Sequence, residues 1–255
     1  NISFFAHDVK ANLHILANAG LTLKNISWDT VLASYLLNAH HHKHSLENLL
    51  LEHFGKQKTP LSDIIGKGKK RIPMHEVTLE TLRDHSCEDV DYTLRLKNLL
   101  EPLLKQRELL DLFYDLEIPL LKVLFEMERE GIFLDADLLK SMSEKLHARI
   151  KTISEEIFDL AGEEFLINSP KQLSHILFEK LNIPPPKKTA TGFSTNAEVL
   201  ESLISEYPIA EKLLIYRSLE KLRSTYVDAL PNEVTPHTQR IHCSFMQYVA
   251  ATGRL

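Results

Sequence analysis

The sequence predicts a mostly α-helical protein with a partial α/β part at its beginning. Only 8 of the 255 residues are Gly and 11 are Pro, so turns are scarce and long helices are favoured. Apolar residues recur at three- and four-residue spacing through most of the chain, which is typical of helices that pack on a core. The opening residues 2–6 form instead a short run of β-prone residues. Together these observations predict an all-helical bulk preceded by a small α/β unit.

Composition excludes several classes of protein. Hydrophobic residues make up 44% of the chain and charged residues 25%, the balance of an ordinary globular protein. No apolar run approaches the ~20 residues that span a bilayer, and no signal peptide is recognisable. The two cysteines, Cys87 and Cys243, lie far apart and are expected to be reduced thiols. We therefore expect a cytoplasmic protein with no membrane partner.

The net charge of −5 is concentrated in one segment. Residues 101–165 contain 8 basic and 16 acidic side chains, whereas the flanking parts are close to neutral. Neutral flanks can still carry basic faces, and an acidic segment would repel an anionic partner. We expect the acidic segment to face away from any such partner.

In the first third, a helical stretch ends near Gly20 and a second helix is expected over 28–38. The tract His40-His41-His42-Lys43-His44 is expected to be a solvated loop, with a metal site as the alternative. Ser45 is a good helix N-cap. The Gly- and Lys-rich stretch 66–71 predicts an exposed basic loop, because it lacks the spacing of a phosphate-binding loop.

The middle third is predicted to be two long helical regions. Helical spacing runs over 79–130, with breaks expected at Pro102 and Pro119. A short extended piece is expected over 132–134. Asp135 then caps a helix that reaches about residue 160, where Ala161-Gly162 stops it.

The last third has clear helix-start signals. Ser169-Pro170-Lys171-Gln172 and Thr195-Asn196-Ala197-Glu198 both read as capping boxes. A stiff basic loop is expected over 184–188. A helix is expected over 208–230, and the alternation over 240–249 predicts a strand.

Two helix features of the second half suit a nucleic-acid backbone. Arg217 and Lys221 are four residues apart and share a helix face, with Ser224 near the same side. The helix start at Ser169 offers free N–H groups and a hydroxyl to a phosphate. Taken alone, such a basic face is more often simply solvated.

Longer motifs resemble one family. The thumb of family-A DNA polymerases is resembled by residues 167–173, 176–181, 187–189, 191–195, 199–201 and 216–226, followed by Leu230-Pro231. The strings Arg240-Ile241-His242, with Gln247, and Ala251-Thr252-Gly253-Arg254-Leu255 resemble the family's first polymerase motif. Residues 15–18, 66–69 and 88–91 resemble the family's 3′–5′ exonuclease-like domain.

The resemblance implies a domain organisation and an activity. It implies a truncated ribonuclease H-like, exonuclease-like domain over 1–105 and the N-terminal part of the polymerase domain, with the helical thumb, over 106–255. The parent would be a monomeric DNA-directed DNA polymerase of DNA replication and repair that uses Mg²⁺. The metal-binding palm motifs and the fingers would lie beyond Leu255, so we expect this stretch to hold no cofactor and to be inactive alone.

The resemblance also implies contacts with double-stranded primer–template DNA. Arg254 is expected in the minor groove near the primer end, where every correct pair presents acceptors at like positions. The residues expected to meet phosphates are Asn168, Ser169, Lys171, Arg217, Lys221, Ser224 and Thr225.

The exonuclease-like motifs depart from the family pattern. Proofreading of this type needs four carboxylates that hold two metal ions, with a Tyr beside the attacking water. Here the third carboxylate position is Asn12, the Tyr position is His85, and only Asp89 is kept as a metal ligand, if the site is active at all. Asp8, one helical turn before Asn12, could substitute for it as a metal ligand, and His85 could still orient the water. We expect an inactive domain; the alternatives are an active proofreading exonuclease and a DNA-binding module without chemistry.

Overall fold

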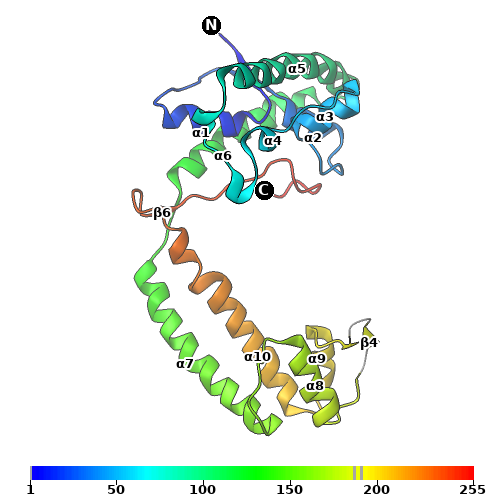
Figure 1. Ribbon diagram of the computed structural model, residues 1–255, viewed down its shortest axis with the longest axis vertical. Coiled ribbons are helices and arrows are strands. Elements are labelled where there is room, and N and C mark those ends of the chain that lie inside the picture. Colours follow the sequence, from blue (N-terminus) through cyan, green and yellow to red (C-terminus); the bar gives the residue numbers. More distant parts are fainter. Residues whose placement is uncertain (1, 186–187, 190–191) are drawn as a thin grey trace. The chain divides into compact units, whose positions relative to one another are not determined.

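The computed structural model describes residues 2–185, 188–189 and 192–255. The chain divides into two compact units (Figure 1). The first contains residues 1–131 and 243–255, and the second contains residues 132–242. The expected domain boundary at 105/106 lies inside the first unit. That boundary divides the domains of the family, whereas the two units are defined by packing, so the boundary stays a prediction.

The first unit begins with a parallel βαβ motif. Strand β1 (Phe4–Ala6) pairs with β2 (Ile26–Asp29), and helix α1 (Val9–Asn18) forms the crossover between them. Parallel strands require such a crossover, because a tight turn can join only antiparallel ones. The β-prone start and the stop near Gly20 are thus confirmed. Helix α2 (Thr30–Leu37) begins later than expected, because Trp28 and Asp29 belong to β2.

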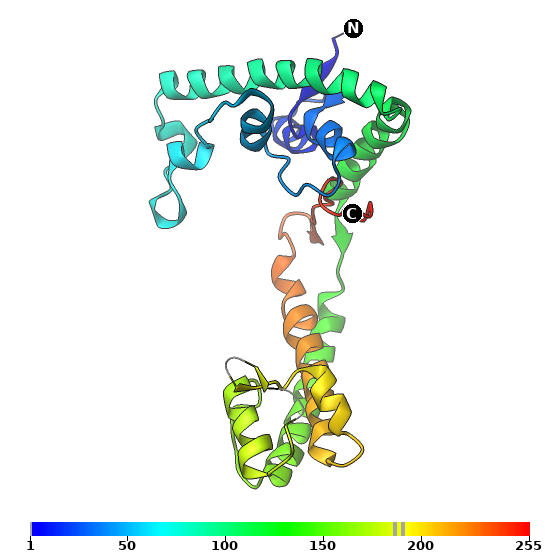
Figure 2. The ribbon, with the colours of Figure 1, turned by 90° about the vertical axis from the view of Figure 1, so that its right-hand side faces the viewer.

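Helices close the core of the first unit over this motif. Figure 2 shows α5 (Leu79–Gln106) as the long helix that runs along the unit. The ring of Trp28, fully buried, lies 4.5 Å from that of Phe113. Helix α3 (Leu46–Phe54) starts at its expected cap Ser45, and the short helices α4 (Leu61–Ile65), η1 (Gly68–Lys70) and η2 (Met74–Glu76) follow.

The two prolines of the middle third do not end helices. Pro102 lies inside α5, which continues to Gln106, so the break expected there is wrong. Leu96, Leu100 and Leu104 are all fully buried, and this continuous stripe on both sides of Pro102 outweighs one missing hydrogen bond. Pro119 instead follows a π-helical turn, η3 (Leu112–Glu117), at the start of α6 (Ile118–Glu130).

The second unit is built on two long helices, α7 (Ala136–Ala161) and α10 (Pro208–Leu222), which pack side by side (Figures 1 and 2). Asp135 caps α7 and Gly162 ends it with φ 72°, both as expected. Strand β3 (Ile132–Phe133) pairs with β6 (Arg240–Ile241) in antiparallel fashion. The strand expected over 240–249 is therefore only two residues long.

Shorter elements fill the other end of the second unit. They are α8 (Pro170–His175), the π-helical turn η4 (Ile176–Lys180), the hairpin β4 (Lys188–Thr189) and β5 (Gly192–Phe193), and α9 (Ala197–Leu203). The N-cap of α9 is Asn196, one residue later than expected, because Thr195 is buried and bonded elsewhere. Of the loop expected over 184–188, residues 186 and 187 lie outside the described part.

The helix expected over 208–230 ends earlier. Helix α10 stops at Leu222, a π-helical turn η5 (Arg223–Val227) continues it, and η6 (Leu230–Glu233) follows. Helices thus dominate both units, with one small parallel sheet, which confirms the predicted fold class. In the described part of the chain, no helix is both long enough and apolar enough to cross a bilayer.

Candidate nuclease-like pocket and nucleic-acid interface

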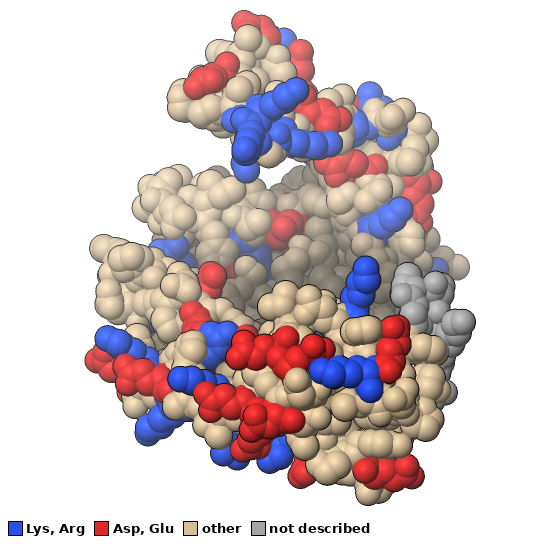
Figure 3. All heavy atoms as spheres, turned by 60° about the horizontal axis from the view of Figure 1, so that its bottom comes forward, with Lys and Arg blue, Asp and Glu red and all other residues tan. Residues whose placement is uncertain are grey.

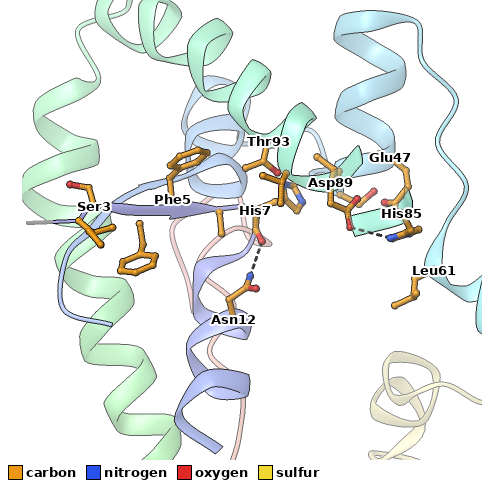
Figure 4. Close-up of a pocket in the computed structure, with 15 residues that line it drawn as sticks. Ser3, Phe5, His7, Asn12, Glu47, Leu61, His85, Asp89 and Thr93 are labelled. Carbon is orange, nitrogen blue, oxygen red and sulfur yellow. Dashed lines mark hydrogen bonds and ion pairs between the residues drawn. The ribbon is translucent and has the colours of Figure 1, made fainter. Parts of the chain in front are cut away.

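One cavity of the first unit collects all three predicted nuclease-like positions. It has a volume of about 600 Å³ and is lined by Asn12 of α1 and by His85 and Asp89 of α5. Figure 4 shows these side chains around the cavity, with His7 between Asn12 and the α5 pair. The cavity thus brings together three positions that lie far apart in the sequence.

The amide of Asn12 is bound to main-chain oxygens at the start of α1. Its amide nitrogen donates to the main-chain oxygen of Asp8, at 2.8 Å, and to that of His7, at 3.2 Å; Figure 4 shows the bond to His7. Asp8 does not lie among the residues that line this cavity. Its carboxylate instead accepts the Ala11 N–H at 3.3 Å and caps α1.

Asp89 is already compensated by a buried cation that the sequence did not reveal. The Lys58 ammonium lies 2.9 Å from Asp89 Oδ1 and 2.8 Å from His85 Nε2, and the Lys58 side chain is only 1% exposed. An ammonium only donates, so Nε2 of His85 accepts and Nδ1 carries the proton that faces Asp89 Oδ2 at 3.3 Å. Lys58 follows from no motif; only the tertiary contact of its loop with α5 identifies it.

These contacts do not suit a divalent ion. Asp89 and His85 are in contact with an ammonium and with each other, so a metal ion that used them as ligands would have to displace Lys58. Within residues 2–185, 188–189 and 192–255, no group of three or more His, Cys, Asp or Glu side chains is placed to hold a metal ion. Of the positions that the family motifs predict, only Asp89 supplies a carboxylate here, and it is paired with Lys58.

A buried carboxylate, Asp29, joins two of the helices of the first unit. Asp29, 1% exposed, accepts the N–H groups of Val9 at 2.7 Å and Val31 at 2.8 Å, and so joins the starts of α1 and α2. Burial raises the pKa of Asp29 to about 6, although these hydrogen bonds oppose the rise. Burial likewise lowers the pKa of His7 to about 4, and its Nδ1 lies 2.8 Å from Thr30 Oγ1.

The exposed part of the His tract behaves as expected, but His44 does not. His44 is 5% exposed, and its Nδ1 lies 2.9 Å from Ser34 Oγ. Burial lowers the pKa of His44. The basic stretch 66–71 is exposed or half-buried, with Lys67 paired to Asp63 at 3.0 Å.

In the second unit, α8 starts at its expected N-cap, but the second bond of the capping box differs, because the Ser169 N–H donates to the Leu166 carbonyl and not to Gln172. Ser169 Oγ accepts the Gln172 N–H at 3.4 Å, and Gln172 Oε1 accepts the N–H of Leu166 at 2.7 Å. Asn168 donates from Nδ2 to the Tyr216 hydroxyl at 3.2 Å, which ties this helix start to α10. Lys171 is exposed.

Of the residues on and after α10 that are predicted to contact DNA, Arg217 is hydrogen-bonded within the protein and the others are exposed. Arg217 is half-buried and donates to the main-chain and hydroxyl oxygens of Thr195, and burial lowers its pKa. Its guanidinium therefore holds the start of α9. Lys221, Ser224 and Thr225 are exposed, although the Ser224 hydroxyl also donates to Glu220 O at 2.7 Å.

The exposed end of α10 is held by an ion-pair network. Arg223 Nη2 lies 2.6 Å from Glu220 Oε1 and its Nη1 lies 2.5 Å from Asp228 Oδ2, while Ser143 of α7 donates to Asp228 Oδ1 at 2.7 Å. This network brackets the π-helical turn η5, which contains Ser224 and Thr225. π-helical turns recur at functional sites, because they re-aim the side chains of a helix. No sequence signal predicts the turn.

Arg254 belongs to the first unit, whereas the other predicted DNA contacts belong to the second. It is exposed and follows Gly253, whose φ is +75°. The acidic segment 101–165 is likewise divided between the two units. Figure 3 shows Asp and Glu side chains interleaved with Lys and Arg over the end that comes forward, so the charge there is mixed.

Comparison with known proteins agrees with this architecture. Residues 136–255 match the model of DNA polymerase family A, and residues 1–95 match that of the ribonuclease H-like domain of DNA polymerase I. The chain belongs to the family-A DNA polymerases.

Relatives that it matches include bacterial DNA polymerase I proteins. It is 39% identical to that of Pseudomonas aeruginosa, over 96% of this chain and 28% of that protein. It is 41% identical to that of Chloroflexus aurantiacus, over 98% and 27%. The chain thus spans about a quarter of the length of these relatives.

A solved structure supports the same relationship. The POL domain of Pol1 from M. smegmatis, in complex with DNA primer-template and dNTP, superposes with a TM-score of 0.81 at 31% identity. The match covers 98% of this chain and 40% of that one.

Proposed function

We propose that this chain is part of a DNA-directed DNA polymerase of replication and repair, and that its second unit grips the primer–template duplex. The observation that carries the proposal is the exposed set Lys221, Ser224 and Thr225 at the end of α10, in a chain similar to a polymerase described in complex with primer-template. An ammonium and hydroxyls suit phosphates, which every duplex step presents alike. Such contacts hold DNA without reading its sequence, as a sliding polymerase requires.

The other residues predicted to contact DNA have different roles in the proposal. Asn168, Ser169 and Lys171 form a second phosphate-binding set at the start of α8, and Arg254 would reach the minor groove from the first unit. Because Arg217 is bound to Thr195, we expect it to support the surface more than to contact DNA. We propose that the whole polymerase uses Mg²⁺, and we assign no Mg²⁺ ligand to this chain. We also propose that the protein is a cytoplasmic monomer.

The first test removes one phosphate contact. We expect Lys221→Ala to weaken binding of every duplex sequence and to lower the slope of log K against log salt by about 1. Lys212→Ala is the matched control: it lies nine residues away, on the opposite side of α10, and is paired with Glu156 at 2.6 Å. Fluorescence anisotropy of a labelled primer–template at several salt concentrations measures both. An unchanged slope in Lys221→Ala would contradict the assignment.

We further propose that the nuclease-like unit does not excise nucleotides. The Asn12 amide bound to main-chain oxygens and the Asp89–Lys58 pair support this proposal. With a mispaired primer–template and Mg²⁺, we expect no shortening of the primer. Steady Mg²⁺-dependent excision that Asp89→Ala abolishes would establish the alternative, an active proofreading exonuclease. A failure of the whole protein to incorporate nucleotides would favour a DNA-binding module without chemistry.

A further inference from the structure

The chain after β6 leaves the second unit and packs into the first, over residues 243–255. These residues belong to the polymerase-family match, whereas most of the unit that receives them matches the ribonuclease H-like domain. The segment 243–250 forms no strand in the described structure. Side chains of the first unit bind its main chain instead.

The innermost anchor is a buried ion pair around Phe245. The carboxylate of Glu128 on α6 accepts the Phe245 N–H at 2.7 Å, and the ammonium of Lys10 on α1 donates to the Phe245 carbonyl. Lys10 and Glu128 also pair with each other, with side chains only 10% and 5% exposed. Both main-chain groups of Phe245 are thus satisfied as a neighbouring strand would satisfy them. His14 Nε2, at 2.6 Å, contacts the second oxygen of Glu128.

Two further anchors follow along the segment. Gln247 donates from Nε2 to the main-chain and carboxylate oxygens of Glu117, at 3.0 and 2.6 Å. The Tyr35 hydroxyl of α2 donates to the carbonyl of Ala250 at 2.8 Å. The last anchor lies only four residues before Arg254. Elements from across the first unit therefore fix this segment at three points.

We propose that Glu128 and Lys10 are positioning residues that clamp segment 243–250 onto the nuclease-like unit and thereby hold Arg254 in place for duplex DNA. In this role the unit serves the polymerase as a scaffold, independently of any excision. The part that concerns Arg254 rests on the proposed function. The clamp itself rests on the contacts alone.

Hydrogen–deuterium exchange of the 255-residue chain tests the clamp without DNA. We expect Glu128→Gln and Tyr35→Phe to accelerate amide exchange of 243–250 at least tenfold, while amides of α5 and α10 keep their rates. Tyr35→Phe removes a single hydroxyl and so remains informative if the Glu128 variant unfolds. Glu126→Gln, an exposed carboxylate on the same helix, is the control. Unchanged exchange in 243–250, or an equal rise everywhere, would overturn the clamp.

A double-mutant cycle tests the consequence for DNA. We expect Arg254→Ala to weaken primer–template binding severalfold in the native chain, but less than twofold in the Glu128→Gln or Tyr35→Phe background, because a released segment no longer holds Arg254. If the effects of Arg254→Ala and of the anchor variant on binding free energy simply add, the positioning role is contradicted. A residue with a merely structural role would leave the effect of Arg254→Ala unchanged. If the native chain binds no duplex at all, the proposed function has failed, and amide exchange still decides the clamp.

Discussion

Asp29 shows how a single buried side chain can organise the first unit. Its two oxygens accept N–H groups from the starts of two helices, and burial raises its pKa from 3.8 to about 6. Between these two pH values the folded state binds more protons than the unfolded state. The free-energy contribution of this group to stability therefore decreases as the pH rises through that window.

Asp29→Asn cannot titrate and should reveal this contribution. We expect the stability advantage of the native protein over the variant to shrink by about 2 kcal/mol from about pH 4 to about pH 6, because the slope is at most 1.36 kcal/mol per pH unit and falls off near each pKa. Urea unfolding followed by the fluorescence of Trp28, the single tryptophan, measures it. Asp115→Asn, at an exposed position of the same unit, is the control. A difference that does not change with pH would refute this account.

At the scale of elements, α5 tolerates a proline because its packing compensates for the lost hydrogen bond. Pro102 is exposed, and the buried Leu100 and Leu104 lie on either side of it. A proline in a helix interior removes one N–H and crowds the preceding turn, at a cost of about 3 kcal/mol. Burying a leucine side chain contributes about 1.5–3 kcal/mol, so the stripe as a whole outweighs the proline.

Pro102→Ala should therefore stabilise the first unit. We expect the free energy of unfolding to rise by about 1–3 kcal/mol, because the helix regains a hydrogen bond, while the more flexible unfolded chain offsets part of the gain. Asn98→Ala, one turn earlier and also exposed, should gain only helix propensity, at most about 0.7 kcal/mol. Urea denaturation compares the two. An equal gain in both variants would show that the proline imposes no specific cost.

At the scale of the whole molecule, the chain forms two units with separate cores. Leu100 is fully buried in the first core and Leu213 in the second. The chain crosses between the units only twice, at 131/132 and 242/243. Separate cores joined by few connections favour separate unfolding transitions.

Leu213→Ala should destabilise the second unit alone. We expect the free energy of unfolding of this unit to fall by about 2–5 kcal/mol. The part of the far-ultraviolet circular dichroism transition that belongs to this unit measures it. Trp28 fluorescence, which reports the first unit, should keep its midpoint. Leu100→Ala should produce the reverse pattern. If both probes shift together in either variant, the two units unfold as one.

Local chemistry made much of this protein predictable from its sequence. Caps at Ser45, Asp135 and Ser169 were assigned correctly, because an N-cap depends on one side chain and the next three N–H groups. The grouping of Asn12, His85 and Asp89 was also predictable, through the family motifs that they occupy. The helix through Pro102 was not, because a buried stripe overrides a local breaker.

The sequence by itself determined the helical class, the family and the positions where the nuclease-like motifs depart from it, since each depends on residue types in order along the chain. The tertiary structure alone decided that Lys58 neutralises Asp89, that Arg217 is bound to Thr195, and that Glu128 and Lys10 hold Phe245. These contacts join residues that are separated by up to 235 positions. Their energies depend on burial and distance, which no local pattern encodes.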